Sequence, residues 1–439
     1  MLENSDHLEE TLMSLMTITC RSMRRPIVAA ALALGVLAAG LGRAQAVEIQ
    51  YWQYVFDTRV QAMTEVIKQF EAENPGITVK QVTFPYADYQ TRLIAAKAAG
   101  RSPEVMQLFY GWLDTFIAGK LVQPLSKGAF QDAEIEKDFF PIVSAMKRNG
   151  EYYGLPTAVR AMALFYNKDL FQKAGLDPEK PPKTLDEFVA AAKAIAKRDA
   201  GGNYQQVGIA LDIARQDHNW WREILVRQYG GESYSEDGSK VAYNTEAGAK
   251  SLEFYTSLQK VHRVGQESFM DEGQAAFRAG LAGMVVDGTF RVASYKTIQS
   301  FKWGVAELPT VDGKKANFGS YFANAIAASA TGEKKAAAEK FMQFISSEKA
   351  MKVWLEKVGE LPARRAVAMT DANVNDPIYG PFIRALSYAS TPPMVDEAQQ
   401  RQVSIDMING VLLKDTPIKE ALKVAADREQ AILDKFKAK

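Results

Sequence analysis

The hydrophobic pattern of this chain changes repeatedly from short strand-like runs to helix-like spacing. The predicted strands are short apolar or alternating runs that stop at polar or turn residues, at 47–51, 77–84, 105–109 and 161–166. The predicted helices carry apolar residues at steps of three and four, from Val60 to the Asn74-Pro75-Gly76 break and at 89–99, 185–195 and 418–436. This alternation is typical of an α/β protein with helices on both faces of mainly parallel sheets.

One helix has a complete start signal. Thr184 follows the Pro181-Pro182 breaker and stands three residues before Glu187, which is the spacing of a capping box. In that arrangement the hydroxyl and the carboxylate each accept a hydrogen bond from a backbone N–H group that the first helical turn leaves unpaired. The spacing predicts that a helix begins at Leu185.

The amino terminus has the three-part layout of a secretory signal. Arg21, Arg24 and Arg25 precede an uncharged apolar run of 15 residues, 27–41, and Ala44-Gln45-Ala46 supplies small residues for a signal peptidase. The run is short against the roughly 20 residues that span a bilayer, so a permanent anchor is the weaker alternative. We expect cleavage after Ala46 and export of the mature chain to the periplasm.

Composition limits the remaining classes. Cys20 is the only cysteine and lies upstream of the apolar run, so the mature chain has no disulfide and depends on core burial. Removing 46 of 439 residues leaves 393, enough for two lobes with separate cores. The net charge is +1 and the mature chain has no basic cluster, which argues against nucleic acid and anionic membranes as partners.

Motifs for cofactors and catalysis are missing from the sequence. His218 and His262 have no second His or Cys at ligand spacing, so no zinc site is predicted. There is no phosphate loop, nucleophile elbow or dinucleotide fingerprint, and we predict neither a cofactor nor an enzyme. A glycosidase stays as an alternative because it needs only two well-spaced carboxylates, and acids near aromatics occur at Asp57, Asp114, Asp212, Asp217 and Asp287.

Large aromatic residues follow several predicted strands or lie in polar stretches. A ring can stack on the C–H face of a sugar while polar neighbours bind its hydroxyl edge, so this placement favours a carbohydrate. The alternative is that each ring belongs to the core. The aromatics concerned are Tyr51, Trp52, Tyr54, Phe84, Tyr86, Phe109, Tyr110, Trp112, Trp220, Trp221, Phe290, Tyr321 and Phe322.

Several segments, in order along the chain, resemble the extracellular solute-binding proteins that serve ABC importers. The clearest are Gly154-Leu155-Pro156 followed by YNKDLF (166–171) and PPKTLDE (181–187). Others are FEAENPG (70–76), GRSPEVM (100–106), GLAGMVVDGTF (280–290), WGVAELP (303–309) and GELPAR (359–364). The chain departs from the family pattern at Glu104, Gly283 and Phe290, where aspartate, alanine and tryptophan are usual.

The resemblance implies a two-lobed periplasmic binding protein fold (type II) with a ligand cleft and hinge between the lobes. The lobes are expected at 47–157 plus about 304–348 (N-terminal lobe) and 158–303 plus about 349–439 (C-terminal lobe). The implied function is capture of a mono- or oligosaccharide by a monomer that delivers it to permease subunits with separate ATPase subunits. The candidate ligand-binding residues are Trp52, Gln53, Tyr54, Tyr86, Tyr110, Arg160, Trp220, Trp221, Asp287, Phe290, Tyr321 and Arg364.

Arg160 has two interpretations. Maltose-binding members of the family carry an acidic residue at the matching place, so an arginine could hold an anionic group or two sugar hydroxyls in parallel bonds. It could equally form a salt bridge across the lobes. A non-sugar solute, such as a glycerol phosphate or a polyamine, is therefore the alternative ligand.

Overall fold

The computed structural model describes residues 46–214, 216–270, 273–392 and 394–437, without the side chains of residues 216–218 and 437. Residues Val47–Lys439 form one compact unit. The predicted charged and apolar parts of the leader lie outside the described residues. No helix in the described part of the chain is long and apolar enough to cross a membrane.

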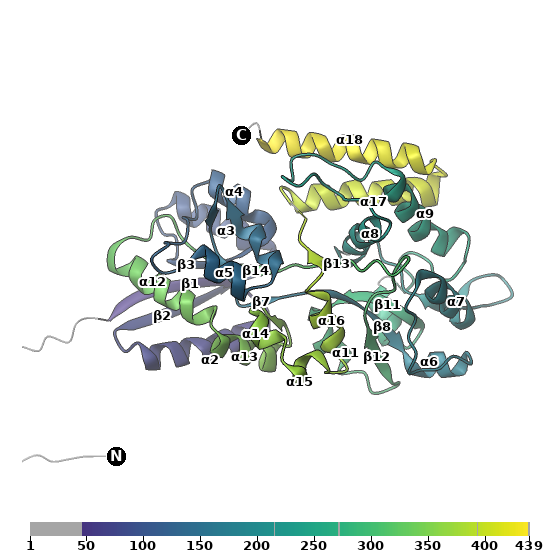
Figure 1. The fold of residues 1–439 in the computed structure, drawn as a ribbon, viewed down its shortest axis with the longest axis horizontal. Helices are drawn as coiled ribbons and strands as arrows, with labels where there is room; N and C mark the ends of the chain where they lie inside the picture. Colours follow the sequence, from purple (N-terminus) through teal and green to yellow (C-terminus); the bar gives the residue numbers. More distant parts are fainter. Residues whose placement is uncertain (1–45, 215, 271–272, 393, 438–439) are drawn as a thin grey trace, which may run out of the picture. The chain divides into compact units, whose positions relative to one another are not determined.

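The N-terminal lobe is built on a five-stranded sheet of order β2-β1-β3-β14-β6 (Figure 1). Its strands are β2 (Ile77–Phe84), β1 (Val47–Tyr54), β3 (Val105–Phe109), β14 (Phe322–Ile326) and β6 (Leu155–Pro156). The lobe also contains α2 (Asp57–Glu73), α3 (Tyr86–Ala98), η1 (Tyr110–Trp112), α4 (Leu113–Ala118), α5 (Asp132–Asp138), η2 (Pro141–Met146), β4 (Lys147–Arg148), β5 (Glu151–Tyr152), α12 (Gly332–Ile345) and α13 (Glu348–Val358).

The C-terminal lobe is built on a second sheet of order β12-β8-β11-β10-β9. Its strands are β12 (Trp303–Ala306), β8 (Met162–Asn167), β11 (Ala282–Gly288), β10 (Tyr204–Ile209) and β9 (Lys197–Arg198). The lobe's helices are α6 (Lys168–Lys173), α7 (Leu185–Ile195), α8 (Gln216–Gln228), α9 (Glu246–Lys260), α10 (Gly273–Arg278), η3 (Thr289–Arg291), α11 (Val292–Tyr295), α16 (Gly380–Ala385), α17 (Glu397–Lys414) and α18 (Ile418–Lys437).

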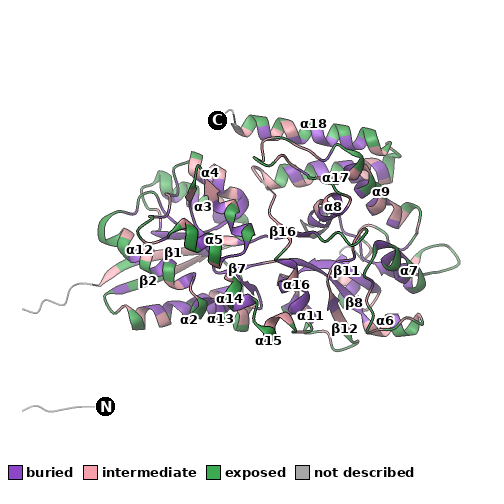
Figure 2. Ribbon diagram, viewed as in Figure 1, coloured by how far each residue is buried: buried purple, intermediate pink, exposed green. Residues whose placement is uncertain are grey.

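Every residue of β8 is buried, and its alternate side chains enter two cores. Phe165 packs with Tyr295 and Phe382 on one face, whereas Leu164 and Tyr166 join the helices of the other face. Figure 2 shows the same burial, with the strands of both sheets largely buried between helices. The predicted layering of helices on both faces is therefore confirmed for this sheet.

The prediction of mainly parallel sheets was wrong, because both sheets are mixed. β1 pairs in parallel with β2 and β3, but β14 is antiparallel to β3, and β8 is antiparallel to both β11 and β12. The strands β8 and β14 each follow a passage of the chain from the other lobe. They enter their sheets reversed because they do not arrive through a local strand–helix–strand crossover, which is what keeps neighbours parallel.

The chain passes between the lobes through short paired segments. β7 (Ala158–Val159) is antiparallel to β15 (Leu361–Pro362), and β13 (Asn317–Phe318) is parallel to β16 (Ala389–Ser390). Arg160 and Ser320 exchange backbone hydrogen bonds of 2.9 and 3.2 Å. The remaining short helices, α14 (Arg365–Ala368) and α15 (Asp371–Val374), follow β15.

Two parts of the predicted lobe boundaries need correction. Residues 304–306 were assigned to the N-terminal lobe, but they lie in β12, which pairs with β8 of the second sheet. Residues 349–358 were assigned to the C-terminal lobe, but α13 packs against α2. The signals for both segments were local, whereas lobe membership depends on pairing partners far away in sequence.

The predicted start of α7 is confirmed. The Thr184 hydroxyl accepts a hydrogen bond from the Glu187 N–H at 3.1 Å, and the Glu187 carboxylate accepts one from the Thr184 N–H at 3.2 Å. The first helix, α2, begins at Asp57 and not at Val60, and α3 begins at Tyr86 and not at Tyr89. Both helices therefore start immediately after the strand that precedes them.

Candidate functional site between the lobes

A cavity of about 560 Å³ lies between elements of the two lobes, and we call it the interlobe cavity. The N-terminal lobe supplies side chains from the first turns of α3, from η1 and from α4. The C-terminal lobe supplies the start of α17 and the end of α18. Its lining includes Tyr86, Trp112, Val395, Asp396, Glu397 and Lys435.

The N-terminal wall of the cavity is aromatic. The rings of Tyr86 and Trp112 lie nearly parallel, with centroids 6.1 Å apart and an interplanar angle of 27°. Tyr86 is 48% exposed, and the ring of Tyr54 packs edge-to-face against it, with ring centroids 5.2 Å apart. These rings come together because β1, β2 and β3 are parallel, so their carboxyl ends meet at one edge of the sheet.

The opposite wall is the polar start of α17. The Asp396 carboxylate accepts a hydrogen bond from the Gln399 N–H at 3.1 Å and so caps the helix. Glu397, in the first turn, forms an ion pair of 3.6 Å with Arg401. The cavity thus has flat rings on one side and hydrogen-bonding groups on the other.

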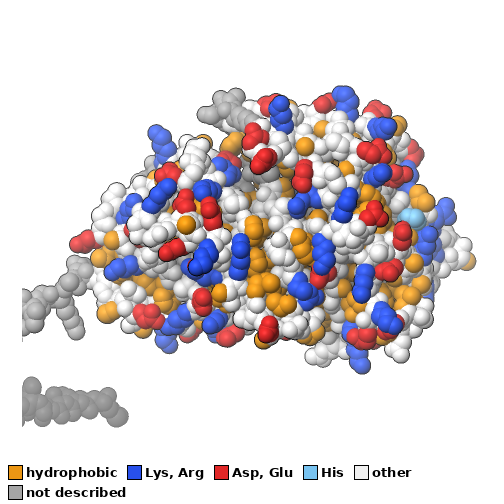
Figure 3. Space-filling view, viewed as in Figure 1, with side chains coloured by type: hydrophobic (Ala, Val, Ile, Leu, Met, Phe, Trp, Pro, Cys, Tyr) orange, Lys and Arg blue, Asp and Glu red, His pale blue; other side chains and the backbone are white. Residues whose placement is uncertain are grey.

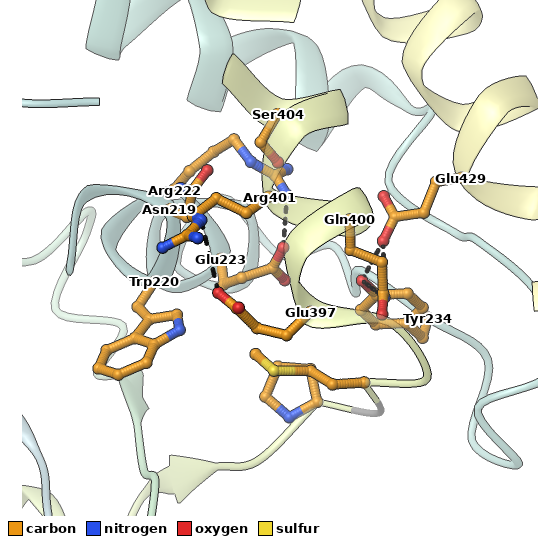
Figure 4. A pocket seen from close by; sticks show the side chains of 12 residues that line it. Asn219, Trp220, Arg222, Glu223, Tyr234, Glu397, Gln400, Arg401, Ser404 and Glu429 are labelled. Atoms are coloured by element: carbon orange, nitrogen blue, oxygen red, sulfur yellow. Dashed lines mark hydrogen bonds and ion pairs between the residues drawn. The ribbon is translucent and has the colours of Figure 1, made fainter. Parts of the chain in front are cut away.

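A smaller space of about 40 Å³, which we call the inner pocket, lies beside the same helix start (Figure 4). Glu397 lines both spaces. Trp220, from α8, forms another part of the inner pocket and stacks on Phe318, with centroids 4.6 Å apart and an interplanar angle of 9°. Arg222 and Glu223 lie next to it and are hydrogen-bonded at 2.5 Å.

The charges around the two spaces nearly balance. Four carboxylates and three cations line them, namely Glu223, Asp396, Glu397, Glu429, Arg222, Arg401 and Lys435. Burial raises the pKa of Glu223 above its usual range, although the positive charge of Arg222 opposes the shift. The guanidinium of Arg222 is buried, and its Nε atom has no hydrogen-bond partner among the described residues. Such a site suits an uncharged ligand with many hydroxyl groups better than a strong anion or cation.

Arg160 lies where the lobes join and is held by a carboxylate. Its Nε atom donates a hydrogen bond of 2.7 Å to Glu360, which is 4% exposed and also accepts hydrogen bonds from Arg59 and from Trp354. Burial alone would raise the pKa of Glu360, but the charges of Arg59 and Arg160 outweigh it and lower the pKa to about 2. The guanidinium of Arg160 lies over the rings of Phe322 and Phe290, at 5.1 and 5.7 Å. This geometry supports the salt-bridge interpretation of Arg160.

Some of the predicted site residues lie at or next to these spaces. Tyr86 lines the interlobe cavity and Trp220 lines the inner pocket. Tyr54 lies behind Tyr86, and the buried Tyr110 hydroxyl donates a hydrogen bond of 3.3 Å to the Pro392 carbonyl. Phe290 lines neither space and is partly buried beside Arg160.

Two residues of β1 that were predicted as ligand contacts do not line either space. Trp52 donates a hydrogen bond to Gln50 and packs on Phe84. Gln53 is fully buried, and both polar atoms of its side chain have no hydrogen-bond partner among the described residues.

Four further predicted contacts have structural roles away from the two spaces. Trp221 is 1% exposed and packs against Phe188 and Tyr255 in the core of the C-terminal lobe. Asp287 accepts hydrogen bonds from Gly288 N–H and from Tyr295, and the buried Tyr321 donates to Ile142. Arg364 pairs with Asp138 at 2.6 Å. The polar groups of Asp287, Tyr321 and Arg364, which the resemblance proposes as ligand contacts, are thus bonded within the protein.

Sequence reasoning missed the C-terminal wall of the cavity. Trp112, on the N-terminal wall, is among the aromatics that follow strands but not among the candidate ligand contacts, and no residue of the segment 395–401 is among those candidates. A signal for the wall is present, because Pro392-Pro393 breaks the chain and Asp396 then stands three residues before Gln399, as at a capped helix start.

No cluster of three or more metal-ligating side chains occurs in the part of the chain that the structure describes. The His218 side chain lies outside the described residues. Figure 3 shows basic and acidic side chains interspersed over the visible face.

Comparisons with known proteins agree with this architecture. The chain is 27% identical over 358 residues to the sn-glycerol-3-phosphate-binding periplasmic protein UgpB of Escherichia coli (strain K12), covering 77% of this chain and 79% of UgpB. Among solved structures it is similar to an ABC transporter solute-binding protein from Thermotoga lettingae bound with alpha-D-tagatose, with 25% identity, a TM-score of 0.73, and coverage of 88% of this chain and 100% of that chain.

A second similar solved structure is the cyclic alpha-maltosyl-1,6-maltose binding protein from Arthrobacter globiformis, with 23% identity and a TM-score of 0.77. The match covers 88% of this chain and 99% of that chain. That likeness concerns the fold alone. The fold is the two-lobed type II periplasmic binding protein fold, as the sequence predicted. Residues 57–352 match the family described as bacterial extracellular solute-binding protein, and the chain belongs to this family.

Proposed function

We propose that this protein binds an uncharged mono- or oligosaccharide in the interlobe cavity and delivers it, unaltered, to the permease of an ABC importer. The observation that carries the proposal is the pairing of two near-parallel rings, Tyr86 and Trp112, with the polar start of α17 across the cavity. Rings stack on the C–H faces of sugars, and carboxylates and backbone groups bind hydroxyls. The tagatose ligand of the Thermotoga lettingae protein supports the same class.

The near balance of charge is what favours a neutral sugar. Glu397 is already paired with Arg401, and Arg160 is paired with Glu360. An anionic ligand would lie close to the carboxylates of Asp396 and Glu397. Among the residues that line the interlobe cavity, Lys435 is the cation that could offset their charge.

We also propose that the protein acts as a monomer in the periplasm, after cleavage near Ala46.

The second candidate ligand is a glycerol phosphate. The likeness to UgpB favours it. Lys435 would face a phosphate group in the interlobe cavity, whereas Arg222 and Arg401 would first have to leave their ion pairs with Glu223 and Glu397. The two candidates differ in the charge of the ligand and so can be separated by one panel of compounds.

The test is thermal unfolding of residues 47–439 with neutral, acidic and sulfonated sugars, glycerol phosphates and polyamines. A ligand at 100 times its Kd stabilises the folded state by about 2.7 kcal/mol, which gives a clear rise in Tm. We expect a neutral sugar to raise the Tm and to be recovered unchanged by chromatography. Stabilisation by sn-glycerol 3-phosphate alone would favour the second candidate, and conversion of the sugar would show an enzyme.

A further inference from the structure

The C-terminal wall of the interlobe cavity is held in place by the side chain of Gln400. Its Oε1 atom accepts hydrogen bonds from the backbone N–H groups of Val395 and Asp396, at 2.9 and 3.2 Å. Both of these residues line the cavity, whereas Gln400 is 7% exposed and lines the inner pocket instead. The Val395–Asp396 backbone, which belongs to the wall of the interlobe cavity, is therefore held in position by hydrogen bonds to a side chain outside that cavity.

Gln400 is in turn held by a buried carboxylate of α18 (Figure 4). The Nε2 atom of Gln400 donates to Glu429 Oε1 at 3.1 Å and lies 3.1 Å from the Tyr234 hydroxyl. Glu429 is 1% exposed. It also accepts a hydrogen bond from Tyr234 at Oε1 and one of 2.8 Å from Tyr243 at Oε2.

This chain of contacts determines the orientation of the Gln400 amide. The NH₂ group of Gln400 only donates hydrogen bonds, so it faces the carboxylate oxygen of Glu429, which accepts. The amide oxygen then faces the N–H groups of Val395 and Asp396, which only donate. Glu429 thus holds the amide group of Gln400, and the amide oxygen of Gln400 holds the backbone of Val395 and Asp396. Leaving one polar group of such a buried network without its partner costs folding free energy.

We infer that Gln400 and Glu429, which line the inner pocket but not the interlobe cavity, are positioning residues for the ligand site and set the place of the Val395–Asp396 backbone. The inference rests on the proposed function only where it concerns sugar binding; the position of the wall can be measured without any ligand. Glu429 thereby links the carboxyl-terminal helix α18 to the site.

The experiment compares single variants with an exchanged pair. Gln400→Glu keeps acceptors for the wall backbone but places two carboxylates together, and Glu429→Gln removes the anionic acceptor. In the double variant Gln400→Glu with Glu429→Gln, the amide and the carboxylate change places and the same series of contacts can form again. Gln402→Ala is the matched control, because Gln402 lies on the same helix, is exposed, and bonds only Asp406 among the described contacts.

Tyr243→Phe is a second control. It removes the hydrogen bond to the far oxygen of Glu429 and so weakens the buried cluster without touching the bond to Gln400. It separates a general loss of stability from a loss of wall position.

The first measurement is amide hydrogen exchange of Val395 and Asp396 in the ligand-free protein, and the second is binding of D-tagatose and maltotriose by calorimetry. We expect each single variant to speed exchange of these two amides by about tenfold, which corresponds to about 1.4 kcal/mol. In Gln400→Glu, repulsion between the two carboxylates moves residue 400 away from the wall backbone, and in Glu429→Gln the Gln400 amide loses its charged partner. We expect the exchanged pair to restore slow exchange and both controls to leave it unchanged. Sugar affinity should follow the same order.

Exchange of these amides within about twofold of the wild-type rate in both single variants would overturn the inference. So would an equal acceleration in Tyr243→Phe, or no recovery in the exchanged pair. If no neutral sugar of the thermal panel binds the wild-type protein while the exchange results hold, the proposed ligand class fails and the positioning role stands.

Discussion

The Nε atom of Arg160 lies 2.7 Å from Oε1 of Glu360, although the two residues are 200 positions apart in the sequence. Arg160 belongs to a segment that joins the lobes, and Glu360 precedes β15, which pairs with β7 beside it. Arg59 of α2 bonds the same carboxylate. One buried carboxylate therefore ties the first helix of the N-terminal lobe to the passage between the lobes.

Replacement of Glu360 should strongly destabilise the protein. In Glu360→Gln, the buried Arg59 and the partly buried Arg160 would lose their anionic partner, and loss of one member of a buried ion pair typically costs about 3 to 5 kcal/mol. Urea unfolding followed by circular dichroism gives the free energy of unfolding. Glu73→Gln is the control, because Glu73 is exposed and its pair with Lys349 should contribute less than about 1 kcal/mol. Equal effects of the two substitutions would contradict the assigned role.

The same carboxylate should make stability depend on acid pH. The pKa of Glu360 is about 2 in the folded protein, below its usual value of 4.5, so its contribution to stability is complete above pH 4.5. That contribution is lost as the pH falls from 4.5 towards 2, because the unfolded state binds the proton first. We expect the stability difference between wild type and Glu360→Gln to shrink over this range, in unfolding curves at pH 7, 4.5 and 3. A difference that is constant with pH would show that Glu360 is not ionised in the folded state.

Tyr86→Ala should weaken sugar binding with little loss of stability. The ring is 48% exposed and lies parallel to Trp112 at the interlobe cavity, so it is available to a ligand. We expect affinity for the sugar found in the thermal panel to fall about tenfold, while Tyr86→Phe, which keeps the ring, stays near wild type. Tyr204→Ala, outside the lining of the cavity, is the control in the same calorimetric titration. Unchanged affinity in Tyr86→Ala would remove stacking from the proposed mechanism.

Trp221→Ala should act on the fold and not on the ligand site. The indole is 1% exposed among Phe188, Phe254 and Tyr255, and removal of such a side chain costs about 3 to 5 kcal/mol. Denaturant unfolding would measure this loss. The remaining folded protein, kept below its Tm, should bind sugar with wild-type affinity. A selective loss of affinity with normal stability would mean that Trp221 does reach the ligand.

Gly208→Ala should disrupt the packing of α7 on β10. A Cβ atom at this position would lie 2.1 Å from the Ala192 carbonyl oxygen, which is backbone and cannot move aside alone. We expect a loss of more than about 2 kcal/mol in unfolding free energy. Gly128→Ala is the control, because a Cβ there meets no atom within 4 Å. A tolerated Gly208→Ala would show that the two elements are less closely packed.

The sequence by itself determined the features that depend on neighbouring residues. The capping box at Thr184 and Glu187 is formed by residues three apart, and the strand-end position of Tyr86 follows from the break after Phe84. The α/β class and the two lobes also follow from local alternation and chain length. These signals involve residues that are close in sequence, so the local structures that they predict do not depend on contacts with distant parts of the chain.

The tertiary structure alone decided which of these residues share a site. Trp220 and Trp221 are adjacent, but successive helix positions differ by about 100° around the axis, so Trp220 lines the inner pocket while Trp221 enters the core. The partners of Arg160, Gln400 and Trp112 are Glu360, Glu429 and Tyr86, and each partner belongs to a different helix, strand or connecting segment from the residue that it contacts. No local pattern encodes such pairings, because they depend on the relative placement of whole sheets and helices.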